Sequence, residues 1–121
     1  MKAHEKSDFE ALVERGVLRF GGDTQGLDAQ MVGWTLWVLC RQRWGSPEQQ
    51  GGGRETLKLK ALVSVPEGWK VSFLYRADYD GTNPAFDPPW CRMVHVEALF
   101  WDDLHRLLTF EVLEEGCWEP H

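Results

Sequence analysis

The chain has 121 residues, of which 43% are hydrophobic and 26% are charged, a composition typical of a single globular domain over residues 1–121. No apolar run approaches the ~18 residues of a transmembrane helix, and the charged N-terminus lacks the apolar core of a signal peptide, so we expect a cytoplasmic protein that does not bind a membrane. The net charge of −6 argues against direct nucleic-acid binding.

The first predicted element is a short helix near the N-terminus. Ser7 begins a capping box, and apolar residues recur at helical spacing over residues 9–13. Gly16 can end this helix in the left-handed conformation, and residues 17–20 then predict a short strand. The alternative is a helix that continues through Gly16 to Phe20, because the apolar stripe extends that far.

Period-two alternation of apolar residues predicts the strands of the central part of the chain. The predicted strands cover residues 31–44, 55–65, 69–76 and 90–99. The first of them has hydrophobic side chains on both faces, which is typical of a strand in the middle of a sheet. Polar and glycine-containing loops separate the strands, and no regular helices alternate with them, which favours an antiparallel meander.

The last segment fits two structures. Trp101, Leu104 and Leu108 lie at helical spacing, and Asp102 is a suitable N-cap, so we expect a helix over residues 102–109. The competing interpretation is a turn at Asp102 and Asp103 followed by a long strand. The fold class that follows is α+β: an antiparallel sheet of four to five strands, arranged as a meander, with an N-terminal and a C-terminal helix packed on one face.

The negative charge is unevenly distributed along the chain. Residues 1–60 contain nine Lys or Arg and eight Asp or Glu, a net charge of +1, whereas residues 61–121 contain four and eleven, a net charge of −7. The simplest explanation is solubility. A more specific one is an acidic surface that binds a basic partner.

Acidic and aromatic residues coincide in the segment 78–90, which we expect to be a functional loop because exposed Trp and Tyr dominate binding hot spots. The predicted partner-binding residues are Asp78, Tyr79, Asp80, Phe86, Asp87, Trp90, Asp102 and Asp103. Small, acidic, single-domain proteins of this kind include immunity proteins, antitoxins and anti-defence proteins. We therefore expect a non-enzymatic inhibitor that masks a basic surface of another protein.

The alternative function is a small-molecule-binding or enzymatic domain. In that case a concave sheet would form an aromatic-lined pocket, with His95 and Glu97 as its polar groups. The aromatic residues that would line this pocket are Trp34, Trp69, Phe73 and Tyr75.

Two sets of residues resemble metal sites only in part. Cys91, Met93, His95 and Glu97 share one face of a predicted strand, but same-face neighbours lie about 7 Å apart, too far to hold one ion easily. The acidic residues of segment 78–89 do not match the spacing of a helical calcium loop. Because the sequence also contains no catalytic or cofactor signature, we expect no metal, no cofactor and no catalytic residue. Cys40, Cys91 and Cys117 stand outside any CxxC pair and are expected to be free thiols.

Overall fold

The computed structural model describes residues 3–45, 53–79, 90–101 and 104–118. Two helices and five strands follow one another in these segments. Their bounds are α1 (Ala3–Glu14), β1 (Leu18–Gly21), α2 (Ala29–Trp44), β2 (Gly53–Val65), β3 (Gly68–Tyr79), β4 (Trp90–Trp101) and β5 (Arg106–Trp118). No helix in these segments is long and apolar enough to cross a membrane.

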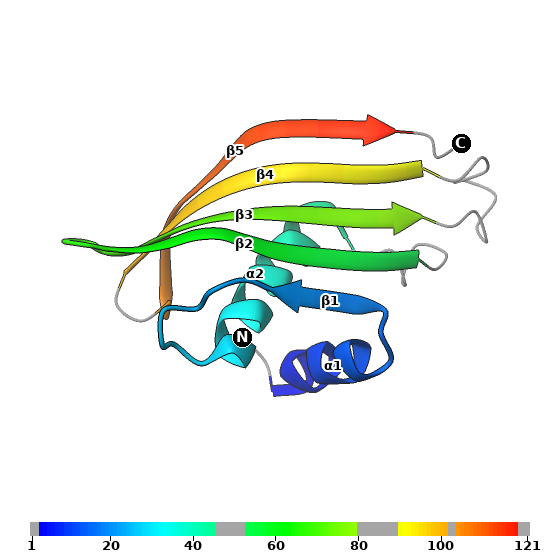
Figure 1. The fold of residues 1–121 in the computed structure, drawn as a ribbon, viewed down its shortest axis with the longest axis horizontal. Coiled ribbons are helices and arrows are strands. Elements are labelled where there is room, and N and C mark those ends of the chain that lie inside the picture. The colour runs from blue at the N-terminus through cyan, green and yellow to red at the C-terminus, as the bar shows by residue number, and fades with distance from the viewer. Residues whose placement is uncertain (1–2, 46–52, 80–89, 102–103, 119–121) are drawn as a thin grey trace.

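The strands form one sheet in the order β1-β2-β3-β4-β5. From β2 to β5 each strand is antiparallel to the next, whereas β1 is parallel to β2. Parallel neighbours need a crossover connection, and α2 is the helix of that crossover. Figure 1 shows α2 against one face of the sheet, α1 beside β1, and the long strands curving at one end. We call the opposite face the outer face; one row of cross-strand neighbours on it is Lys58, Leu74, His95 and Glu114.

Residues 31–44, which were expected to form a central strand, lie in helix α2, so this prediction is wrong. The helix begins after Asp28, whose Oδ1 accepts hydrogen bonds from the backbone N–H groups of Gln30 and Met31 at 2.9 and 3.4 Å. Its buried residues are Val32, Gly33, Trp34, Thr35, Leu36, Trp37, Val38 and Cys40. A helix that is apolar on all sides has the same sequence pattern as a strand buried on both faces, and this similarity misled the prediction.

The expected C-terminal helix is also wrong. Residues 104 and 105 lie in a turn, and the chain then forms β5, as in the competing interpretation. Leu104 is buried and has a φ of 70°, a left-handed conformation that ends regular structure. The predicted antiparallel meander with a helix at each end is therefore replaced by a mixed sheet whose two helices both precede β2.

The N-terminal helix is confirmed, although it begins before the predicted cap at Ser7. It ends as predicted at Gly16, which has a φ of 75°. The N–H of Gly16 donates to the carbonyl of Val13 at 3.1 Å, and the N–H of Val17 donates to that of Leu12 at 3.0 Å. The chain then turns back into β1, so the interpretation with a break at Gly16 is the correct one.

The other predicted strands are confirmed as β2, β3 and β4. A bulge in β2 between Leu59 and Ala61 changes the face on which the later side chains lie. Leu62 is therefore buried, whereas Ala61 and Val63 are exposed. The uniform alternation expected along this strand is wrong from the bulge onward.

The hydrophobic core lies between α2 and the inner face of the sheet. Leu36 and Trp37 of α2 are fully buried with Phe73 of β3 and Val96 of β4. Burial of a large apolar side chain contributes about 1.5–3 kcal/mol, so each of these four side chains stabilises the packing of α2 on the sheet. Helix α2 covers the inner face of the sheet, and an open groove remains at the border of this core, beside α1 and β1.

Candidate functional site

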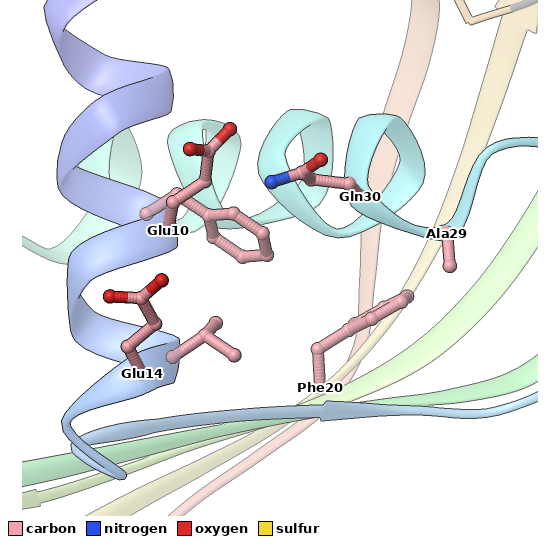
Figure 2. A pocket seen from close by; sticks show the side chains of 7 residues that line it. Glu10, Glu14, Phe20, Ala29 and Gln30 are labelled. Atoms are coloured by element: carbon pink, nitrogen blue, oxygen red, sulfur yellow. The ribbon is translucent and has the colours of Figure 1, made fainter.

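A groove beside α1 is the candidate functional site. It has a volume of about 320 Å³ and lies between α1, β1 and the first turn of α2 (Figure 2). The residues that line it are Phe9, Glu10, Val13, Glu14, Phe20, Ala29 and Gln30. We call it the acidic groove, because two glutamates border a largely apolar floor. Its volume is near the lower end of the roughly 300–1,000 Å³ typical of binding pockets.

Gly33 of α2 makes the floor of the groove possible. A Cβ atom at this position would lie 2.8 Å from Cζ of Phe9 and 3.0 Å from Cγ of Phe20. A residue without a side chain therefore allows both rings to approach the helix. Val13 is 41% exposed and Phe20 is half-buried, so these two side chains present apolar surface to solvent beside the buried ring of Phe9.

The rim of the groove is negatively charged. Glu10 and Glu14 are four residues apart on α1 and thus on the same side of the helix. Figure 2 shows their carboxylates on the same side of α1, with Gln30 across the groove on α2. Neither glutamate forms an ion pair within the described segments. The groove therefore combines apolar surface with two carboxylates that are available to a cationic group.

A second polar feature lies beneath α2 and is closed to solvent. Glu55 of β2 is 1% exposed, and its Oε2 accepts hydrogen bonds from the hydroxyl of Tyr75 at 2.6 Å and from Nε1 of Trp37 at 3.1 Å. Burial, together with the negative charge of Glu55, raises the pKa of the Cys40 thiol well above its ordinary value. Trp44 covers the ring of Tyr75 in a stacked arrangement. This cluster joins α2 to the sheet, and its buried carboxylate is out of reach of a ligand.

The predicted partner-binding residues are described in part. Asp78 lies half-buried on β3, where its Oδ1 accepts a hydrogen bond from Nε of Arg76 at 3.0 Å. This hydrogen bond and the charge of Asp78 raise the pKa of the Arg76 guanidinium. Tyr79 and Trp90 are paired at the adjoining ends of β3 and β4. The other predicted residues, Asp80, Phe86, Asp87, Asp102 and Asp103, lie outside the described residues.

His95 and Glu97 lie on the outer face of β4, away from α2. Nε2 of His95 is 2.8 Å from Oγ of Ser72, and the carboxylate of Glu97 is 3.2 Å from Nζ of Lys70. The aromatic residues expected around them lie on the inner side: Trp34, Phe73 and Tyr75 are buried, and Trp69 is half-buried. Because the sheet separates the two groups, they do not share one pocket.

Cys91 and Met93 share the outer face of β4 with His95 and Glu97, as the alternation predicted. Across the described ranges there is no group of three or more His, Cys, Asp or Glu side chains that could hold a metal ion. The thiols of Cys40 and Cys91 are both buried and free, as expected for these two cysteines.

Sequence reasoning missed the acidic groove and the buried carboxylate, although each had a local signal. Glu10 and Glu14 are four residues apart, so they lie on one side of any helix that contains both. Glu55 alternates with Leu57 and Leu59, so period two places it on the buried face of β2. Neither signal indicates which element supplies the opposite wall or the hydrogen-bond donors.

The chain matches no protein-family model, and no curated protein or solved structure is significantly similar to it. The function is therefore inferred from the shape and charge of the molecule.

Proposed function

We propose that this protein is a non-enzymatic binding domain that recognises a basic and partly apolar segment of another protein. The observation that carries the proposal is the acidic groove, where Phe9, Val13 and Phe20 form an apolar floor beside the carboxylates of Glu10 and Glu14. An apolar side chain of the partner packs against the floor of the groove, and a neighbouring Lys or Arg of the partner forms ion pairs with the two glutamates. The net charge of −6 attracts such a partner at long range and speeds the encounter.

Covering a basic segment inhibits any partner that uses this segment to bind its own target. The proposed role is therefore inhibitory, of the immunity, antitoxin or anti-defence type. We place the protein in the cytoplasm, because Cys40 and Cys91 are free thiols, as is usual in a reducing compartment. The predicted residues of segment 78–90 do not line the acidic groove. They contact the same partner only if the interface extends beyond this groove.

The experiment that tests this proposal compares two charge reversals of equal size. The groove variant carries Glu10→Lys and Glu14→Lys, and the control variant carries Glu111→Lys and Glu114→Lys on the exposed edge strand β5. Each variant and the wild-type protein are used to capture partners from the native cytoplasm. The captured protein is then purified, and its association rate and Kd are measured for all three forms at two salt concentrations.

We expect the control variant to bind within about two-fold of the wild-type affinity and the groove variant to lose about ten-fold or more, mainly through slower association. Reversal of a basic residue in the partner should restore binding to the groove variant. The proposal is refuted if no protein is captured, if the groove variant binds as well as the wild type, or if the control variant loses as much affinity.

A further inference from the structure

Three arginines from neighbouring strands meet on the outer face around Thr56 of β2. Arg19 of β1 and Arg76 of β3 are the cross-strand neighbours of Thr56, and Arg54 precedes it by two residues on the same face of β2. These four residues line one recess of about 220 Å³, together with Gly16 and Val17 from the turn after α1, and with Glu55 and Asp78. We call it the arginine recess. It lies on the opposite face of the sheet from α2.

The positive charge of the recess is only partly compensated. Asp78 binds Nε of Arg76, which uses one of the five N–H donors of that guanidinium. Glu55 also lines the recess, but its carboxylate points to the other side of the sheet, where Trp37 and Tyr75 donate to it. Arg19 and Arg54 are exposed and form no ion pair in the part of the chain that the structure describes.

The shape of the positive region indicates a small anion. The planar donor fork of arginine fits a phosphate oxygen pair, and three forks around a hydroxyl can surround one tetrahedral group. Lys58 extends the positive charge by one exposed residue along β2, but across the sheet the outer face becomes acidic toward β5, with Glu97, Glu111 and Glu114. An extended polyanion would need a basic track that continues across these strands. A recess of about 220 Å³ has room for one such group and little more.

We propose that the arginine recess binds a phosphate group, either free or as the monoester of a small molecule. Arg19 and Arg54 supply donors from two sides, Arg76 supplies donors from the third, and the hydroxyl of Thr56 donates at the base. Asp78 holds the guanidinium of Arg76 in place through its Nε, so Asp78 is a positioning residue. This site is separate from the acidic groove and takes a ligand of opposite charge.

The test is a titration of ¹⁵N-labelled protein in which the amide chemical shifts are monitored, at constant ionic strength and a pH of about 7.5. The probes are inorganic phosphate, phenyl phosphate, sodium chloride as the non-specific control, and a short single-stranded oligonucleotide. The recess variants are Arg19→Gln and Arg54→Gln. The matched control is Arg106→Gln, which removes an exposed arginine from β5, the edge strand opposite β1.

We expect saturable shifts from phosphate or phenyl phosphate at residues 16–20, 54–56 and 76–78. Each recess variant should weaken this binding by about ten-fold, whereas Arg106→Gln should leave it unchanged. Tighter binding of phenyl phosphate identifies a monoester as the ligand, and equal binding identifies free phosphate. The proposal is overturned by shifts that do not saturate, by equal losses in the control variant, or by an oligonucleotide that binds more tightly than either phosphate probe. Melting temperatures within about 2 °C of the wild type exclude misfolding as the cause.

Discussion

The substitution Tyr75→Phe should destabilise the protein although it leaves the aromatic packing intact. The hydroxyl of Tyr75 donates a 2.6 Å hydrogen bond to the carboxylate of Glu55, which is 1% exposed. The ring itself is stacked on Trp44, and a phenylalanine preserves this contact. The variant therefore removes the hydrogen bond from the Tyr75 hydroxyl to a buried carboxylate and keeps the ring.

The expected loss follows from the charge of the acceptor. Hydrogen bonds to charged groups contribute roughly 1.5–3 kcal/mol, and the buried carboxylate cannot replace the lost donor with bulk water. We expect the free energy of unfolding to fall by about 2 kcal/mol. For a domain of this size such a loss lowers the melting temperature by about 6–12 °C.

Urea denaturation followed by tryptophan fluorescence measures this loss, provided that the m-value stays constant. The matched control is Ser72→Ala, which removes a half-buried side-chain hydrogen bond to His95 on the outer face and should cost about 0.5–1 kcal/mol. A double-mutant cycle of Tyr75→Phe with Glu55→Gln, which keeps an acceptor oxygen but removes the charge, measures how much of the hydrogen bond depends on that charge. We expect a coupling energy of about 1 kcal/mol. A loss in Tyr75→Phe no larger than in Ser72→Ala, or a coupling energy near zero, would refute this reasoning.

Two further predictions concern buried positions of α2. Gly33→Ala should lower the free energy of unfolding by up to about 2 kcal/mol, because a Cβ atom 2.8 Å from Cζ of Phe9 forces overpacking of about 1–3 kcal/mol against a helix-propensity gain of about 1 kcal/mol. Increased stability in urea would contradict this. The Cys40 thiol should resist alkylation in the folded protein and react once urea unfolds the chain, since burial raises its pKa. For the same reason stability should fall as the pH rises above the ordinary thiol value of 9.0, where the unfolded chain loses a proton that the folded chain keeps. The variant Cys40→Ala should lose less stability than the wild type between a pH of about 8 and about 10, and identical pH profiles would show that Cys40 does not contribute.

Local sequence signals were sufficient to predict an element when one of its faces is buried and the other is exposed to solvent. Strands β2, β3 and β4 alternate in this way, and their positions were predicted. Gly16 ends α1 as predicted, because a left-handed residue is needed there and glycine has no Cβ penalty. Helix α2 also had helical end signals, with Asp28 as N-cap, Arg41 and Arg43 in the last turn, and Gly45 after it. The prediction followed the alternation of apolar residues and did not use these signals.

The choice of strand for β5 depended on its neighbour. Trp101, Leu104 and Leu108 fit a helical stripe, but β4 offers a free row of backbone hydrogen-bonding groups that β5 pairs with from Arg106 to Trp118. The positive φ of Leu104 turns the chain into that pairing. The periodic pattern of one segment does not show whether a strand elsewhere in the chain has an unpaired edge for that segment to join.

The sequence by itself determined the acidic net charge, the first helix with its end, and four of the strands, because each follows from composition or from the pattern of a single segment. The tertiary structure alone decided both proposed sites. The acidic groove exists because Gly33 admits two rings from α1 and β1, and the arginine recess exists because β1 pairs in parallel with β2 and brings Arg19 beside Thr56. Both depend on contacts between residues far apart in the chain, whose free energy no local pattern encodes.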